Sequence, residues 1–238
     1  MNKEIMAQQM LVMLELQNKM NSTVNPNWIN AGNDWTLAIL VEAVEAIGHH
    51  GWKWWKKETP DMVQLRMELV DIWHFLLSDL IVKYCEVYTY QSMSNLFTDD
   101  FLDSELSEKD INNEFTLIQY LKEIIGLAAN SQVSIDLFAQ TMKKAGLSWN
   151  ELYSTYIAKN CLNIFRQNNG YKSGEYIKDW SSCELVNPIE MIEDRPLEDN
   201  DHLHDLIQSM DMTVPDVFNA LTNGLEARYN QIKENAQV

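Results

Sequence analysis

The amino-acid sequence predicts an all-α fold, on three observations. The 238 residues include only 8 glycines and 5 prolines, which is few for a chain of this length. Alternation of apolar and polar residues with a period of two, which is typical of strands, is scarce. Apolar residues instead recur every three or four positions, as they do along one face of a helix. We therefore predict a helical bundle in a single domain covering residues 1–238.

Caps and apolar stripes set the ends of the expected helices. Seven helices are expected, over residues 3–21, 34–48, 60–88, 107–129, 133–145, 149–168 and 215–233. Thr59 and Pro60 are a typical N-cap and first residue for the third of them. Ser107 and Ser148, each followed three residues later by an acid, resemble capping boxes.

Two segments lack a helical pattern. Residues 92–113 are acidic and polar, and residues 181–205 are acidic, irregular and interrupted by two prolines. We expect both segments to be excursions on the surface of the domain.

The overall charge excludes several classes of partner. The formal net charge of −17 argues against nucleic acid and against an anionic membrane. Cys85, Cys161 and Cys183 are odd in number and far apart, which fits a reduced protein better than a disulfide framework or a zinc site. No uncharged apolar run is long enough to span a bilayer, and the N-terminus is a poor signal peptide. We expect a cytoplasmic protein that binds neither membrane nor nucleic acid.

Two acidic pairs on apolar helices are the main candidate for a functional site. Glu42 and Glu45 are three residues apart, as are Glu68 and Asp71, so each pair lies on one helix face. Carboxylates among apolar neighbours are costly to bury unpaired. If the two helices pack antiparallel, the four groups converge on one spot, where Mg²⁺ or Mn²⁺ would relieve their repulsion.

The alternative for the acidic pairs is a solvated surface. A lone E-x-x-E is common on exposed helices, and only the second pair on a more apolar helix makes a metal site about equally favoured. Between the pairs, residues 52–57 form a basic and aromatic cluster that suggests a polyphosphate attached to a ring, although tryptophans more often belong to the core. We expect the neighbouring His49 and His50 to flank a turn.

Further along the chain, Lys159, Asn163 and Arg166 follow one another at four and three residues and form one polar stripe. Such a stripe can hold phosphate oxygens, or it can be a solvated helix face, and the spacing leaves both open. Gln17 and Asn21 lie one turn apart, and their position alone favours ordinary surface amides.

Several of these motifs carry a family resemblance. They are the run of residues 16–21, E-x-x-E at residues 42–45, W-K-W-W-K at residues 52–56, E-L-V-D-I-W-H-F at residues 68–75 and K-N-C-L-N-I-F-R-Q-N-N-G-Y-K at residues 159–172. Together they resemble the dimeric all-α dUTPases, within the wider all-α NTP pyrophosphatases. Residues 48–51 depart from the family's turn, and residues 92–147 and 181–238 match no motif.

The resemblance implies a role for each of these residues. Glu42, Glu45, Glu68 and Asp71 would hold Mg²⁺, with Mn²⁺ as the alternative ion. The uracil and deoxyribose would be bound by Gln17, Asn21, Trp55, His74 and Phe75. The phosphates or the attacking water would be contacted by Lys159, Asn163, Arg166, Tyr171 and Lys172, and Lys56 lies in the tryptophan cluster of the substrate site. Family members are homodimers.

The expected function is therefore Mg²⁺-dependent hydrolysis of dUTP, and of dUDP, to dUMP, which keeps uracil out of DNA. Glu45 is the acid expected to orient the attacking water and accept its proton, and Asn163 is the second candidate catalytic residue. Two alternatives remain: a pyrophosphatase with another base preference, such as dCTP, and a helical regulatory protein that does not catalyse.

Overall fold

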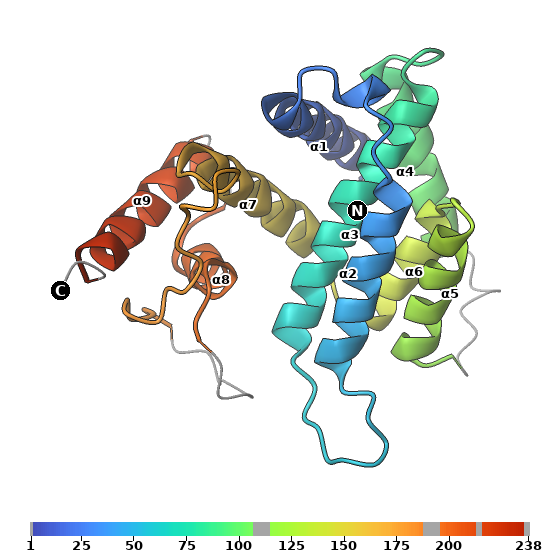
Figure 1. The fold of residues 1–238 in the computed structure, drawn as a ribbon. Coiled ribbons are helices and arrows are strands. Elements are labelled where there is room, and N and C mark those ends of the chain that lie inside the picture. Colours follow the sequence, from blue (N-terminus) through green and yellow to red (C-terminus); the bar gives the residue numbers. More distant parts are fainter. Residues whose placement is uncertain (1, 107–114, 188–195, 213–215, 236–238) are drawn as a thin grey trace. The chain divides into compact units, whose positions relative to one another are not determined.

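The chain folds into α-helices, which confirms the predicted fold class. The computed structural model describes residues 2–106, 115–187, 196–212 and 216–235. Within those residues it contains nine α-helices and no strand (Figure 1). The structure divides into two compact units, residues 1–153 and residues 154–238, and each is described by itself. The boundary falls inside a continuous helix, and the expectation of one domain stays a prediction.

The helix bounds follow the expected ones closely for α1, α2, α6 and α7. The elements are α1 Lys3–Val24, a 3₁₀ turn Trp28–Asn30, α2 Trp35–His50, α3 Met62–Tyr84, α4 Tyr90–Leu106, α5 Leu117–Ala129, α6 Ile135–Lys144, α7 Trp149–Asn168, α8 Asp199–Ser209 and α9 Val217–Asn235. The predicted cap Ser107 lies outside the described residues, and Thr116 caps α5 through a capping box with Gln119. The predicted capping box of Ser148 and Glu151 is present at the start of α7.

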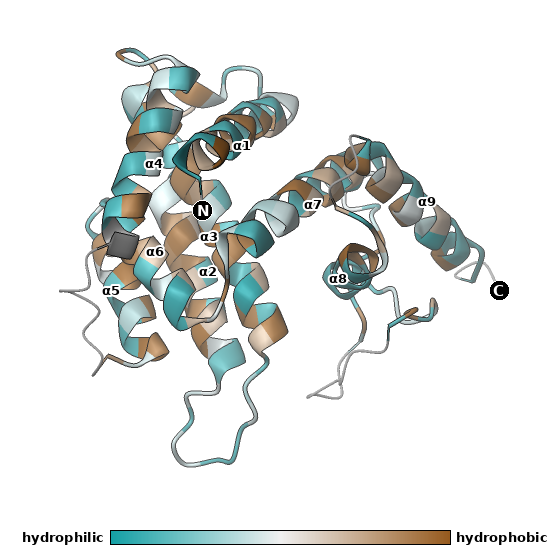
Figure 2. Ribbon diagram, turned by 180° about the vertical axis from the view of Figure 1, so that it is seen from behind, coloured by the Kyte–Doolittle hydropathy of each residue, from teal (hydrophilic) through white to brown (hydrophobic). Residues whose placement is uncertain are grey.

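The core of the first unit is built around α3, which packs against α1, α2 and α6. Most of the α3 side chains are buried, and Trp73 is at their centre. Its ring stacks on Phe138 at 4.8 Å and meets Phe101 and Trp149 edge to face. Hydrophobic and hydrophilic residues alternate around the neighbouring helices (Figure 2), which therefore bury one face each.

The predicted start of α3 at Thr59 and Pro60 is wrong. The helix begins at Met62, and the Asp61 carboxylate caps it by accepting the N–H of Gln64 at 3.1 Å. The Asp61 N–H donates to the carbonyl of His49 at 2.8 Å and so closes the base of the loop between α2 and α3. An aspartate cap two residues further on satisfies both the helix end and the loop, which explains the shift.

The predicted surface excursion at residues 92–113 is wrong for the part that the structure describes. Residues 90–106 form α4, which packs against α1 and α6. Met93, Phe97 and Phe101 recur every four residues and are buried. The intervening acids masked this stripe in the sequence, because they lie on the outer side of an amphipathic helix.

The second unit is held by an aromatic cluster. Phe165 of α7 meets Trp180 and Tyr229 edge to face, and Tyr176 stacks on Tyr229 at 5.1 Å. The excursion predicted at residues 181–205 is also wrong at its end, because α8 begins at Asp199. Leu203 and Leu206 are buried there, and α8 packs against α9. No helix in the described parts of the chain has the length and apolar character needed to cross a bilayer.

Candidate active site

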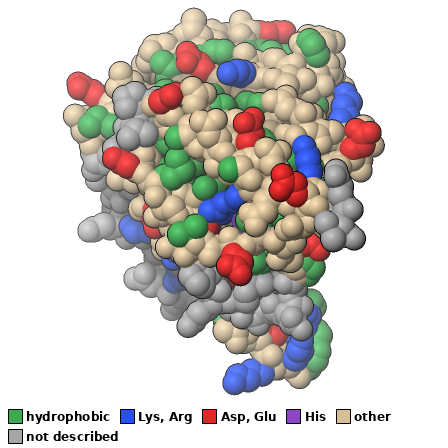
Figure 3. Space-filling view, turned by 90° about the vertical axis from the view of Figure 1, so that its left-hand side faces the viewer, with side chains coloured by type: hydrophobic (Ala, Val, Ile, Leu, Met, Phe, Trp, Pro, Cys, Tyr) green, Lys and Arg blue, Asp and Glu red, His purple; other side chains and the backbone are tan. Residues whose placement is uncertain are grey.

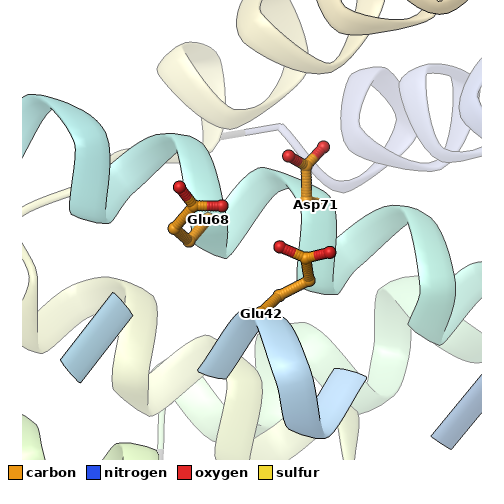
Figure 4. Close-up of side chains that lie close together, drawn as sticks. All are labelled: Glu42, Glu68 and Asp71. Atoms are coloured by element: carbon orange, nitrogen blue, oxygen red, sulfur yellow. The ribbon is translucent and has the colours of Figure 1, made fainter. Parts of the chain in front are cut away.

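Three carboxylates meet between α2 and α3. Glu42 comes from α2, Glu68 and Asp71 come from α3, and their side chains point into the same space (Figure 4). One carboxylate oxygen of each lies within 4.8 Å of the other two. Glu68 is only 7% exposed, and the other two are half-buried. Oxygen donors this close together, and only oxygen donors, are the set that a hard divalent cation prefers.

Burial and the neighbouring carboxylates of this cluster both act on the pKa of Glu42. Burial raises the pKa of Glu42, and the charges of Asp71, Glu68 and Glu45 raise it further, to about 8. The cluster therefore retains a proton at neutral pH when no cation is bound. A divalent cation that binds here displaces this proton.

Two residues border the cluster. Glu45 lies one turn after Glu42 and is exposed, and it is not one of the three converging groups, although its charge reaches Glu42. His49 places Nε2 at 3.3 Å from Oε1 of Glu68. Of the four carboxylates expected to converge, three do so and Glu45 lies beside them, and their role as metal ligands stays a prediction. His49 contacts one of the three.

The predicted base-recognition residues are joined by hydrogen bonds in the interior of the first unit. Oε1 of Gln17 is 2.8 Å from Nδ1 of His74, and Gln17 donates to Oδ1 of Asn21 at 3.1 Å. Asn21 donates to the hydroxyl of Ser78 at 2.9 Å. Gln17 is only 3% exposed, so the surface-amide alternative is wrong. Four side chains from α1 and α3 therefore form one polar network in an apolar setting.

Aromatic rings lie beside this network. Phe75 is half-buried and stacks on Trp35 with ring centres 6.2 Å apart, and Trp35 meets Trp28 edge to face. The indole of Trp28 donates to Asn18 on α1. A planar base is bound by a flat apolar surface and directed hydrogen bonds, and side chains of both kinds occur on α1, the 3₁₀ turn, α2 and α3.

The tryptophan cluster lies on the loop between α2 and α3, which projects beyond the ends of these helices (Figure 1). Trp54 is 89% exposed, and Trp55 is in edge-to-face contact with both Trp52 and Trp54. In Figure 3, the lowest part of the drawn face, where Figure 1 places this loop, carries basic side chains beside hydrophobic ones. This arrangement leaves Trp55 and Lys56 on an exposed surface.

The structure does not bring Trp55 to the amide network. The loop precedes α3, which begins at Met62, whereas His74 lies about 18 Å further along the helix axis at 1.5 Å per residue. The loop is ordered from within: Glu58 accepts the backbone N–H of Lys53 at 2.9 Å and pairs with its ammonium at 3.0 Å. The predicted contact of Trp55 with uracil stays a prediction.

The polar stripe of α7 lies in the second unit. Lys159 is only 1% exposed and donates to Oδ1 of Asn200 at 3.1 Å. Arg166 donates to Oδ1 of Asn163 at 3.1 Å and pairs with Asp199. Tyr171 and Lys172 follow the helix and are exposed, and the Arg166 guanidinium lies 5.7 Å from the Tyr171 ring centre. The stripe is thus a set of ordered hydrogen bonds and not a solvated face.

Comparison with known protein families identifies the family to which the chain belongs. A family model described as dUTPase matches residues 9–171, which is more than half of the chain. The chain belongs to the all-α dUTPase family. Membership implies dUTP diphosphatase activity for this protein. No curated protein matches the sequence.

The matched region of this dUTPase contains the three converging carboxylates, the amide network and the polar stripe of α7. It ends before Lys172 and before α8, so Asp199, the ion-pair partner of Arg166, lies outside it. Sequence reasoning missed Trp35, Ser78, His49 and Asp199 as neighbours of the predicted site residues. Ser78 could have been predicted as a neighbour, because it lies one turn after His74 on the same helix. Asp199 could not, because its segment has no helical pattern in the sequence.

Proposed function

We propose that the protein hydrolyses dUTP to dUMP and pyrophosphate, and dUDP to dUMP and phosphate, in a reaction that depends on Mg²⁺. The observation that supports this most directly is the convergence of Glu42, Glu68 and Asp71 in a chain of the dUTPase family. Removal of dUTP would lower the supply of uracil for DNA synthesis. We further propose that the protein acts as a homodimer, as the resemblance implies.

The three carboxylates would hold the cation, and Mn²⁺ is the expected substitute for Mg²⁺. When bound, the cation neutralises phosphate charge and lowers the pKa of water. Glu45, exposed beside the cluster, is the residue that we assign to orient the attacking water and accept its proton. The carboxylate takes the proton, the water oxygen bonds to the phosphorus that it attacks, and the anhydride link between the α- and β-phosphates breaks. dUMP then separates from pyrophosphate, or from phosphate when dUDP is the substrate.

The remaining residues bind the substrate. The amides of Gln17 and Asn21 each offer a donor and an acceptor, which suits the edge of uracil. His74 fixes the Gln17 amide, and Phe75 supplies a ring surface. Lys159, Asn163, Tyr171 and Lys172 are assigned to the phosphates, and Arg166, which is paired with Asp199, supports them through Asn163. Trp55 and Lys56 are assigned to the outer part of the substrate site.

The test is release of pyrophosphate and phosphate from a panel of dNTPs and dNDPs, with Mg²⁺ and with chelator. We expect dUTP and dUDP to be the preferred substrates and chelator to abolish turnover. Glu68→Ala should lower kcat by at least about a hundredfold, because the cation loses a buried ligand. Glu123→Ala, an exposed acid on α5, is the matched control and should leave kcat unchanged.

Other outcomes would contradict the proposal. Preference for dCTP would make the protein a pyrophosphatase of different base specificity. Absence of turnover with every nucleotide, together with Mg²⁺-independent binding, would make it a regulatory protein. Wild-type rates from Glu68→Ala would show that the carboxylate cluster is not the metal site.

A further inference from the structure

The buried carboxylate of Asp199 binds the guanidinium of Arg166 through both of its oxygens. Nε of Arg166 donates to Oδ2 of Asp199 at 2.8 Å, and Nη2 donates to Oδ1 at 2.8 Å. The hydroxyl of Tyr176 donates to Oδ2 of the same carboxylate at 2.9 Å. Asp199 is the first residue of α8 and is 0% exposed. The pair is therefore bidentate and shielded from water, which is the strongest geometry for such a contact.

The Nε/Nη2 edge of Arg166, one of the two edges through which a guanidinium can bind two phosphate oxygens, is thus occupied by the protein itself. Burial raises the pKa of Asp199, but hydrogen bonds and charge from Arg166 outweigh burial and hold it below its ordinary value. Asp199 is therefore ionised at neutral pH. Releasing Arg166 to a phosphate would leave this charge buried without compensation, which is strongly unfavourable. The pair is best understood as permanent.

The Nη1 group of Arg166 orients the side-chain amide of Asn163. Nη1 of Arg166 donates to Oδ1 of Asn163 at 3.1 Å. A guanidinium has donors only, so it fixes the Asn163 amide with the carbonyl toward Arg166 and the NH₂ group on the other side. An NH₂ group presented in this way suits a phosphate oxygen, which accepts hydrogen bonds and donates none when ionised.

We propose that Asp199 is a positioning residue for phosphate binding: it locks the Arg166 guanidinium, which in turn presents the Asn163 amide as a donor to the substrate polyphosphate. The proposal rests on the proposed function, because it takes Asn163 to be a phosphate contact. It also assigns Asn163 a role in holding phosphate through its NH₂ group.

The second unit contains a similar pair that serves as a control. Arg228 of α9 bonds the buried Asp205, which also accepts the backbone N–H groups of Val186 and Asn187 at 3.0 and 2.7 Å. Through Asp205, this pair joins α9 and the segment before α8 to α8, the helix that also carries Asp199. None of its partners is a predicted substrate contact, so its role is structural.

The experiment compares Asp199→Asn with Asp205→Asn in the full-length protein. Binding of α,β-imido-dUTP with Mg²⁺ is measured by calorimetry, binding of deoxyuridine by NMR, and unfolding by thermal melts, together with kcat and KM for dUTP. We expect both variants to lower Tm. Only Asp199→Asn should weaken binding of the imido analogue, by at least about tenfold, while binding of deoxyuridine, which has no phosphate, stays as in the wild type.

A second variant keeps the proposal testable if Asp199→Asn does not fold. Arg166→Lys retains one positive charge but cannot hold both oxygens of Asp199 and also reach Asn163. It should show the same selective loss for the imido analogue. Asn163→Asp, which replaces the NH₂ donor by a charged oxygen, should abolish analogue binding.

The possible outcomes distinguish failure of the positioning role of Asp199 from failure of the proposed function. If the wild type neither hydrolyses dUTP nor binds the analogue, the proposed function fails. If the wild type does both and Asp199→Asn and Arg166→Lys bind the analogue normally, the positioning role alone is overturned. Equal losses for the analogue and deoxyuridine, matched by Asp205→Asn, would make the Asp199 pair structural and would also overturn the role.

Discussion

At the scale of single residues, the cluster of Glu42, Glu68 and Asp71 combines two opposing demands. Its carboxylates lie close enough to share one cation, and that closeness destabilises the protein when no cation is present. The raised pKa of Glu42 is the measurable sign of this conflict. The sequence predicted the conflict from the two acidic pairs, but not that Glu45 would stand to one side, because helix spacing does not fix side-chain direction.

The first prediction concerns stability and pH. In the folded protein without metal Glu42 remains protonated up to about pH 8, whereas in the unfolded chain it ionises near its ordinary value of 4.5. Between these values the folded state binds more protons, so the free energy of unfolding should fall as pH rises from about 4.5 to about 8. Urea unfolding in chelator at several pH values measures this, and Glu42→Gln should flatten the curve. If the free energy of unfolding of Glu42→Gln falls with pH as steeply as that of the wild type, other groups cause the pH dependence.

The second prediction concerns His49. If its ring supports Glu68, His49→Ala should weaken Mn²⁺ binding by about tenfold, as is typical when a hydrogen-bond partner of a metal ligand is lost. His50→Ala is the matched control, because the neighbouring His50 is half-buried in the same turn and makes no ion pair with the cluster. Mn²⁺ titration followed by EPR at pH 8 measures both. Equal affinities for the two variants would show that the contact has no role in binding.

The third prediction concerns base choice. Gln17 is buried and bonded to His74 and Asn21, so Gln17→Ala should remove a recognition group while leaving the cation site intact. The barrier for dUTP should rise by about 1–3 kcal/mol, the cost of one lost buried hydrogen-bond pair. The rate with dCTP should change much less. The measured quantity is the ratio of kcat/KM for the two substrates, and a parallel fall of both would make Gln17 purely structural.

At the scale of elements, the helices were predictable where caps and apolar stripes agree. α7 begins and ends as expected, because a capping box and a glycine bracket a clear stripe. α4 and α8 were missed because polar and acidic residues outnumber apolar ones in them, although Phe97 and Leu203 are buried. Composition describes the outer face of such helices, and the few apolar residues at four-residue spacing decide the fold.

The fourth prediction tests the buried side of α4. Phe97→Ala should lower the free energy of unfolding by about 3–5 kcal/mol, the usual cost of deleting a buried aromatic ring. Leu96→Ala, one residue earlier and 37% exposed, should cost less than about 1 kcal/mol. Urea denaturation of both variants measures the difference. Similar small effects would return residues 92–106 to the surface excursion that the sequence suggested.

At the scale of the whole molecule, the motifs spread over residues 16–172 were enough to predict the family from the sequence. The division into two units could not be predicted in this way. The predicted carboxylates and amides all lie in the first unit, and the predicted phosphate contacts of α7 in the second. A boundary inside α7 leaves no linker of glycine, proline or serine to recognise in the sequence. Only long-range packing reveals it, and one sequence does not report that packing.

The last prediction concerns the coupling between the cation and the nucleotide. The carboxylates repel one another without a cation, and a cation without phosphate keeps water in its remaining positions. Mg²⁺ and a nonhydrolysable dUTP analogue should therefore raise Tm together by more than the sum of their separate effects, because each increases the affinity for the other. Thermal melts with Mg²⁺, with the analogue and with both measure this. Glu68→Ala should retain the effect of the analogue alone and lose the excess, whereas strictly additive shifts in the wild type would show that the cation and the nucleotide bind independently.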